Sequence, residues 1–498
     1  MKLFFSLLLV CFALVSCNEP SSNSKKVTVS ESKPNGFVRV NATIQEYNEI
    51  QPWDRKESIQ RRGLGALLED NLILTTSEMV ANQVYLELES ADGIHQIPAK
   101  VVAIDREVNL ALLAPETEEE TFLKDLKAFS LSKNLAIGDE VETWQLESNG
   151  QPTVTKTNIY AVDVVSSYSG GKSIFSYLLK GSLQSASNSY TVPVLSKGMI
   201  AGILTSYDSD EQISEVVTSS IISEFLKDAE DGEYLGFPSL GIAASRMPDQ
   251  SFRDWLGLDA EDGGLYVTRV AKNTAASDGG IEVGDVILAI DGHDLDRKGY
   301  YDDEEYGKLI WTHLIRGRAP IGASIPIKIK RDGEIIEKPV TLRKSSPSLI
   351  PSEFPAGGPQ YFIKGGVIFQ QLTKKYLKAY GGEWSSRAPL NLLELYFQSE
   401  NYEEEFDEAV IITGVIPSQN TVGYESVRSN LVEEVNGVEI NRMADLKTGF
   451  QSPKDGIHHV KLSESPFDIY LDAGACDQVD QALLQQGIPA LSRIHEVE

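Results

Sequence analysis

Cysteine is almost missing from this chain, which has three among 498 residues. Cys11 lies inside an apolar leader-like segment and Cys17 ends it, so Cys476 is the one cysteine expected in the folded part. If the Cys17 thiol is covalently modified, Cys476 has no partner for a disulfide. The fold must then rest on hydrophobic cores.

Basic residues are also scarce, with 45 Lys and Arg against 73 Asp and Glu, for a formal charge of −28. This balance argues against nucleic acid as a partner, because binding nucleic-acid phosphates requires a basic surface. Hydrophobic residues make up 41% and charged residues 24%, which is ordinary for a folded protein. The length predicts about three domains, at roughly 100–200 residues each.

Residues 1–17, MKLFFSLLLVCFALVSC, combine one basic residue, an apolar run and small residues before a cysteine. This pattern is typical of a secretion signal rather than a structural helix. Its end, Leu14-Val15-Ser16-Cys17, resembles the lipobox of bacterial lipoproteins, which implies lipidation of Cys17. Residues 18–35 would form a flexible tether. We therefore expect a protein of the bacterial cell envelope, lipid-anchored to a membrane and facing the periplasm; the alternative is a plain cleaved signal peptide.

Residues 36–228 alternate short apolar segments with turn signals, as in GALLEDNLILTT and NLALLAPE. Few long helical periods occur there, so the pattern predicts an all-β domain built as a pair of barrels. The stretch LTTSEMVANQV, residues 74–84, predicts the end of a buried strand followed by a short turn or helix.

Residues 229–345 predict a small α+β unit. GGLYVTRV is a strand, NTAASDGGIEVGDVILAIDG is a short helix, turn and strand, and IPIKIKRDGEIIEKPVTLR is a hairpin closed at Asp332-Gly333. In EEYGKLIWTHLIRG, Leu309, Ile310 and Leu314 have helical spacing. Such a unit with an open sheet edge is typical of a peptide-binding module.

Residues 346–359 are rich in Ser and Pro and predict a linker. In the last unit, residues 360–498, the segment LVEEVNGVEINRMADL parallels DVILAIDGHDLDRKGY of the previous unit. Both contain an apolar strand, an Asn-Gly or Asp-Gly turn and a short edge strand. The parallel predicts a second, divergent copy of the same module.

This order of segments resembles the Deg/HtrA serine proteases, and most closely their plant-type branch. GIEVGDVILAIDG is similar to a PDZ signature, and GFPSLGIAAS to the entry into a PDZ domain. The resemblance implies a mostly β chain, with a trypsin-like double β-barrel followed by two PDZ-like α+β domains. It implies a homo-oligomer as one possible assembly, and a second PDZ-like domain that serves assembly or regulation more than peptide capture.

The resemblance also implies peptide binding at Ser239-Leu240-Gly241-Ile242, which matches the carboxylate-binding loop. Backbone N–H groups of such a loop face a peptide's terminal carboxylate, and the following strand pairs with the peptide. The expected partners are peptide tails or unfolded proteins. The alternative is that this segment only begins a core strand.

The protease motifs are degenerate. Where family members place a His-Val pair after TN, this chain has Glu78 and Met79, and Asn109 stands at the aspartate position. In place of GNSGG the chain has SASNSYTVPV, where one register puts Ser189 and another puts Tyr190 at the serine position.

These replacements remove the chemistry that a serine nucleophile needs. An ordinary carboxylate at Glu78 is too weak a base, and Asn109 supplies no charge to stabilise a protonated partner. Tyr190 and Thr191 stand where glycines shape the oxyanion hole, so they would strain that loop or change its shape. We predict a pseudoprotease; the alternatives are an active serine endopeptidase with unconventional residues and a purely structural lipoprotein.

Histidine is rare, and His95 is the only one of the six within residues 36–228. Its position in ADGIHQIPA predicts an exposed hairpin residue rather than a relocated base. His458-His459 has no neighbouring Cys or acidic spacing that would complete a metal site, and a surface strand is expected there. We expect neither a metal nor a cofactor.

Overall fold

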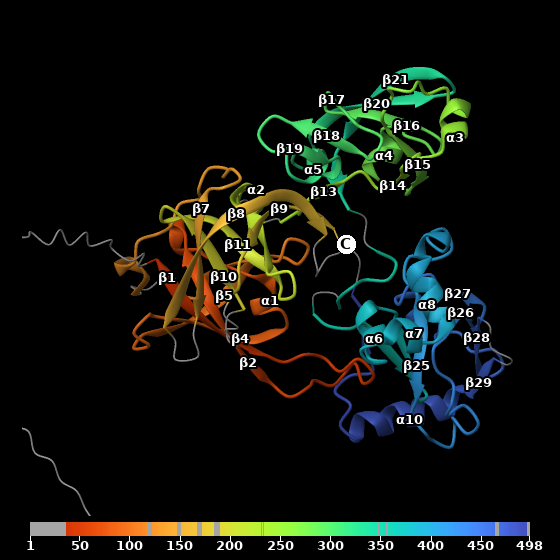
Figure 1. Cartoon of the computed structure of the whole chain (residues 1–498). Helices are drawn as coiled ribbons and strands as arrows, with labels where there is room; N and C mark the ends of the chain where they lie inside the picture. The colour runs from red at the N-terminus through yellow and green to blue at the C-terminus, as the bar shows by residue number, and fades with distance from the viewer. Residues whose placement is uncertain are drawn as a thin grey trace, which may run out of the picture. The chain divides into compact units, whose positions relative to one another are not determined.

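The computed structural model describes residues 36–117, 122–146, 151–166, 172–183, 190–230, 232, 234–345, 348–354, 357–463 and 468–495. The predicted signal and tether, with Cys17, lie outside these residues, and so does Ser189. Residues from 36 onward form one compact unit. Figure 1 labels the elements along the chain.

The first barrel is closed by six antiparallel strands. In β1, Val38, Val40, Ala42 and Ile44 are buried while the residues between them are partly exposed, as expected of a strand with one face on a core. Their order around the barrel is β1 (Phe37–Ile44), β2 (Ile59–Leu67), β3 (Ile73–Thr75), β6 (Leu110–Pro115), β5 (Gln96–Asp105) and β4 (Gln83–Glu89). The short helix α1 (Ser77–Val80) follows β3, as the sequence predicted.

A second closed barrel follows, which confirms the predicted pair. Its order is β10 (Val192–Ser196), β11 (Met199–Asp208), β12 (Ile213–Thr218), β9 (Ser173–Lys180), β8 (Pro152–Ser166) and β7 (Glu140–Leu146). The helix α2 (Ser219–Ala229) begins where the Thr218 side chain accepts a hydrogen bond from the backbone of Ile221. The 3-10 turns are η1 (Glu69–Asn71), η2 (Phe122–Asp125) and, further along the chain, η3 (Ser399–Asn401).

The third unit is an open sheet with short helices. Its main path is β14 (Ile242–Ser245), β15 (Leu265–Val270), β16 (Val286–Ile290), β20 (Ser324–Arg331) and β21 (Glu334–Thr341). Around it lie β13 (Pro238–Ser239), β22 (Arg343–Lys344), β17 (His293–Asp294), β18 (Tyr300–Asp303), β19 (Gly307–Ile310), α3 (Gln250–Trp255), α4 (Ala275–Asp278) and α5 (Thr312–Arg316).

One element of this unit differs from the prediction. The helical spacing of Leu309, Ile310 and Leu314 does not mark a single helix, because β19 ends at Ile310 and α5 begins at Thr312. The first part of this segment is a strand because it pairs with β18, in which Tyr301 lies opposite Leu309. Apolar residues spaced by four or five positions fit a strand followed by a turn as well as a helix.

The fourth unit contains a larger sheet. Its path is β29 (Ile469–Asp472), β28 (Ile457–Leu462), β26 (Asn430–Val435), β25 (Val410–Val415), β24 (Val367–Gln371), β23 (Tyr361–Lys364) and β30 (Ser492–Arg493), with β27 (Val438–Glu439) paired to β26. The helices are α6 (Lys374–Lys378), α7 (Trp384–Arg387), α8 (Leu390–Phe397), α9 (Asp445–Gly449) and α10 (Ala473–Gln485).

The predicted turns match between the third and fourth units. Asp291-Gly292 joins β16 to β17, and Asn436-Gly437 joins β26 to β27. All four residues have positive φ, the conformation that two-residue hairpin turns of this type require. Asp332-Gly333 closes the β20–β21 hairpin in the same way.

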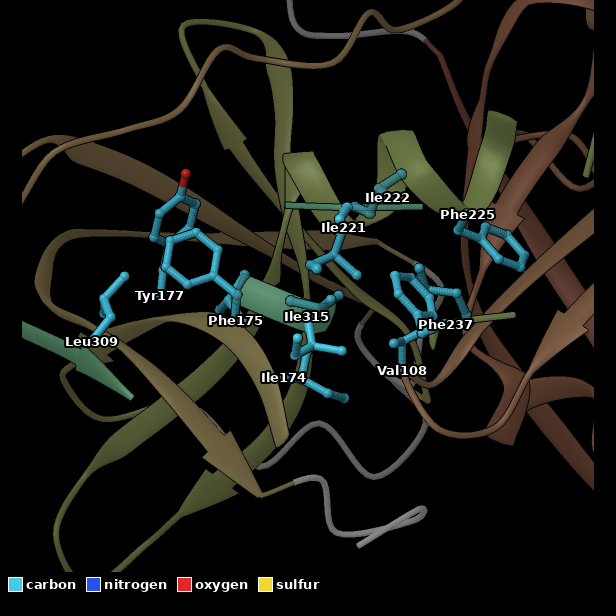
Figure 2. Close-up of a cluster of buried hydrophobic side chains, with 14 of the residues drawn as sticks. Val108, Ile174, Phe175, Tyr177, Ile221, Ile222, Phe225, Phe237, Leu309 and Ile315 are labelled. Carbon is cyan, nitrogen blue, oxygen red and sulfur yellow. The ribbon is translucent and has the colours of Figure 1, made fainter. Parts of the chain in front are cut away.

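A continuous hydrophobic cluster joins the second barrel to the third unit. Figure 2 shows Ile315 of α5 beside Ile174 and Phe175 of β9. An ion pair also links the third unit to the first barrel: Arg316 Nη2 of α5 donates to Oε2 of Glu107, between β5 and β6, at 2.6 Å. The barrel residues therefore form part of the support on which the third unit rests.

His313 lies in this cluster and gives a prediction about pH. Its ring centroid is 4.4 Å from that of Phe175, and its Nδ1 is 2.5 Å from the Tyr301 hydroxyl. Burial lowers the pKa of His313 to about 4. In the unfolded chain the value is about 6.5, so the unfolded state binds more protons between these values and stability falls as the pH decreases.

Between pH 7 and pH 5 the loss from His313 is expected to be about 2 kcal/mol. Urea unfolding of the full chain at both pH values measures it. The variant His313→Gln keeps a side chain able to hydrogen-bond Tyr301 but has no titrating group. An equal pH dependence in both proteins would contradict the assignment.

Candidate functional site

The candidate triad positions Glu78 and Asn109 are neighbours in the structure. Asn109 is buried, and its Oδ1 accepts hydrogen bonds from Ser77 Oγ at 2.9 Å and from the backbone N–H of Glu78 at 3.0 Å. The Glu78 side chain is exposed. Asn109 thus binds the first turn of α1, where backbone N–H groups lack partners within the helix.

The hydrogen bonds to Asn109 stabilise the first turn of α1, and Asn109 does not use them to orient a base. An amide oxygen carries no net charge, whereas a triad carboxylate stabilises the charge that forms on the base. Both donors that reach Asn109 Oδ1 come from structural groups of α1. The arrangement matches a lock on the neighbouring segment more closely than a pocket for a ligand.

Three buried threonines occupy the junction between the barrels. Thr191 Oγ1 lies 2.8 Å from Thr75 Oγ1 and 3.0 Å from Thr76 Oγ1. Thr76 also donates from its hydroxyl to the carbonyl of Tyr190 at 3.0 Å. Side chains therefore hold the segment after the serine position against the β3–α1 junction. Thr191 makes these contacts at a position where the family resemblance implies a glycine of the oxyanion loop.

Tyr190, one of the two residues predicted at the serine position, is bound on both sides. Its backbone N–H donates to the Arg62 carbonyl at 3.3 Å. The Arg61 guanidinium carbon lies 5.2 Å from the centroid of its ring, and Arg61 also donates to the backbone carbonyl of Glu78. Arg61 therefore connects Tyr190 to α1.

Sequence reasoning missed Arg61 as part of this site, and it missed the hydrogen bonds that Thr191 makes there. Thr191 contacts Thr75, which is 116 positions away in the chain. Such a contact has no local signature, because neither propensity nor periodicity reports on distant pairs. The one sequence signal for these contacts was the run of threonine and serine residues around the histidine and serine positions.

His95 and Asp105 of the barrels serve other contacts. His95 is exposed, and its ring stacks on that of Phe122 with the centroids 6.3 Å apart. Asp105 is buried, which raises the pKa of its carboxyl group, and it accepts hydrogen bonds from the backbone of Glu107 and the hydroxyl of Tyr234. Asp105 thus anchors the segment that enters the third unit.

The predicted peptide loop turns at a glycine in the left-handed region. Gly241 has a φ of 75°, and a Cβ added there would lie 2.4 Å from the Cβ of Thr274. The Leu240 and Gly241 carbonyls accept hydrogen bonds from the backbones of Ala276 and Ala271, both at 2.9 Å. The carbonyls are thereby directed to the unit's own backbone, while the Gly241 N–H donates to Ser239 Oγ at 3.2 Å.

The strand after this loop is at the edge of its sheet. β14 begins at Ile242 and pairs with β15, and the sheet path starts at β14. An edge strand offers backbone groups to an added strand, which is how peptides bind by β-addition.

The corresponding edge of the fourth unit is covered by the chain itself. β24 lies between β25 and β23, and β30 pairs with β23. The ring of Phe362 on β23 stacks on that of Phe450 after α9, with the centroids 5.5 Å apart. The backbone N–H of Gly365, before β24, donates to the buried carboxyl of Asp480 at 2.7 Å. This unit differs from the third in offering no such open edge at β24.

His458 and His459 lie on β28, but the surface position predicted for both is wrong for His458. It is buried, and its Nδ1 is 3.0 Å from Asn436 Nδ2. His459 Nε2 lies 2.7 Å from Asp468 Oδ2. Alternation along a strand places neighbouring side chains on opposite faces. Within the described residues no group of three or more potential ligands gathers around a metal position.

No helix in the part of the chain that the structure describes combines the length and the apolar character needed to cross a bilayer. The predicted lipid attachment at Cys17 concerns a residue outside that part.

Comparisons with known proteins find PDZ domains and related proteases. PDZ-domain models match residues 236–297 and 350–490. The chain is 24% identical over 463 residues to the chloroplastic Protease Do-like 2 of Arabidopsis thaliana, covering 92% of this chain and 74% of that protein. It is 23% identical over 417 residues to the mitochondrial Protease Do-like 4 of the same plant, covering 83% and 76%. A solved structure, the HtrA-type protease AlgW with a decapeptide, matches at 19% identity and a TM-score of 0.47, covering 63% of this chain and 96% of that one.

Proposed function

We propose that this chain, which belongs to the Deg/HtrA family of trypsin-like serine proteases with PDZ domains, binds peptides and has no proteolytic activity. In this proposal the first PDZ domain captures peptide tails or exposed segments of misfolded proteins. The double barrel serves as its support, and the protein acts as a scaffold, adaptor or quality-control factor.

One observation carries the proposal. Asn109, at the aspartate position, uses its amide oxygen to hold Ser77 and the backbone of Glu78. A serine hydroxyl becomes a good nucleophile only when a base accepts its proton, and that base in turn needs a partner that orients it. Glu78 is exposed and Asn109 is committed to α1, so this pair supports the loss of general-base catalysis.

Two features of the third unit support the binding half of the proposal. Gly241 has a φ of 75°, and β14 is an edge strand. In the second PDZ domain β23 covers β24, so peptide capture is assigned to the first. We further propose that lipidated Cys17 anchors the protein to a membrane of the bacterial cell envelope, facing the periplasm, and that a homo-oligomer is its assembly.

The proposal predicts that short peptides with a free C-terminal carboxylate bind the full chain and are recovered intact. Fluorescence anisotropy measures binding, and mass spectrometry of the recovered peptide detects cleavage. Peptides ending in an amide are expected to bind about tenfold more weakly, because they lack the charged group that backbone N–H donors bind. Equal binding of both forms would contradict the loop assignment, and cleavage products would favour the active endopeptidase.

A further inference from the structure

The second PDZ domain contains a pocket of about 480 Å³ between α7, the start of α8 and the segment that leads into β26. Its walls include Arg387, Asn391 and Arg428. No Asp or Glu lines it, although the chain as a whole carries a net charge of −28. Two guanidinium groups around one pocket create a local positive potential that an anion would neutralise.

The two arginines are only weakly neutralised by the protein. Arg387 Nη2 lies 3.1 Å from Glu383 Oε2, but both side chains are mostly exposed, and exposed pairs contribute little. Arg428 is exposed and forms no ion pair with a carboxylate among the described residues. Its planar fork of N–H donors is free to bind an oxyanion with two parallel hydrogen bonds.

The backbone beside Arg428 is held in an uncommon conformation. Ser429 is buried and has a φ of 63°, a left-handed conformation that is unfavourable for a residue other than glycine. Three contacts fix it: its N–H donates to the Ile412 carbonyl at 2.6 Å, its carbonyl accepts from Asn391 Nδ2 at 2.8 Å, and its hydroxyl lies 2.9 Å from that of Tyr380. Backbone strain that is fixed by several contacts is common at ligand sites.

A neutral donor completes the pocket. An asparagine amide has two N–H donors, and Asn391 uses one of them for Ser429, which leaves the second for a ligand. Tyr380 also lines the pocket, with its hydroxyl paired to that of Ser429. Two positive forks and a neutral amide match the two charges and three terminal oxygens of a phosphate monoester better than a singly charged carboxylate.

We propose that this pocket binds a phosphate monoester dianion through Arg387 and Arg428. The site goes beyond the proposed function, because neither the barrels nor the first PDZ domain takes part in it. The same group can be carried by a soluble phosphate compound or by a lipid headgroup such as phosphatidic acid, and separate measurements distinguish these sources.

The test titrates inorganic phosphate with the full chain and follows the phosphorus-31 line width in a buffer free of other oxyanions. Saturable binding is expected, and Arg428→Ala and Arg387→Ala should each weaken it by on the order of tenfold, the loss of a charged hydrogen-bonding partner. Arg428→Lys keeps the charge but loses the fork, so an intermediate affinity is expected. Arg442→Ala, in the same domain and paired with Asp407, is the matched control and should change nothing.

Co-sedimentation with phosphatidylcholine vesicles, with and without phosphatidic acid, identifies the source. Binding to inorganic phosphate without co-sedimentation assigns a soluble ligand, and co-sedimentation that Arg428→Ala removes assigns a headgroup. The proposal is overturned if neither form binds, if Arg428→Ala leaves binding unchanged, or if acetate at equal ionic strength competes as well as phosphate.

Discussion

Gly241→Ala is expected to reduce peptide binding by the first PDZ domain by at least about tenfold, since the added methyl group displaces the backbone donors of the loop. The new Cβ would lie 2.4 Å from both the Cβ and the Cγ2 of Thr274. Thr274 cannot easily move, because its side chain caps α4. The loop must therefore shift, and peptide titration of the full-length variant by anisotropy measures the result.

Gly292→Ala is the matched control for this experiment. Gly292 has a φ of 76°, close to that of Gly241, but nothing lies within 4 Å of an added Cβ. It incurs the same backbone strain without the collision, so peptide affinity should stay at the wild-type value. A similar loss of binding in both variants would show that general destabilisation, not loop geometry, causes the effect.

Phe175→Ala should produce the largest loss of stability, about 3–5 kcal/mol, as expected for a large buried aromatic side chain. Phe175 is 4% exposed, and its ring contacts those of His313 and Tyr306 with centroid distances of 4.4 and 5.3 Å. The truncation leaves a cavity in the cluster that joins the second barrel to the first PDZ domain (Figure 2). The shift of the urea unfolding midpoint measures the loss.

Tyr160→Ala on the adjacent strand β8 provides the comparison. Tyr160 is 53% exposed, so its removal should change stability by less than about 1 kcal/mol. If Phe175→Ala is equally mild, the cluster does not support the first PDZ domain in the manner described. If peptide binding falls together with stability in Phe175→Ala, the barrels are needed to maintain the proposed peptide-binding loop.

The local features of the fold were predictable from the sequence because each has a local cause. Asp291-Gly292 and Asn436-Gly437 form the predicted turns, since few other residue pairs tolerate positive φ at both positions. The α5 region was not predictable in the same way. Leu309 pairs across a hairpin with Tyr301, and the rest of the segment is fixed by packing on β9, which no spacing within the segment reveals.

The candidate site shows the same contrast between local features, which were predictable, and long-range contacts, which were not. The residue types at Glu78 and Asn109 were enough to predict a loss of triad chemistry, because a triad requires particular functional groups. The contacts at these positions were not predictable: Thr191 reaches Thr75 and Thr76, and Arg61 joins Tyr190 to α1. Each contact connects segments that are distant in the chain, so their meeting depends on the closure of both barrels.

We propose that the double barrel does not perform serine proteolysis. A fluorophosphonate probe, which labels activated serines covalently, tests this most directly on the full chain beside its Ser189→Ala variant and a Deg-type protease with an intact triad. We expect strong labelling of the intact protease and only equal background labelling of the other two. Labelling of this chain that disappears in Ser189→Ala would contradict it.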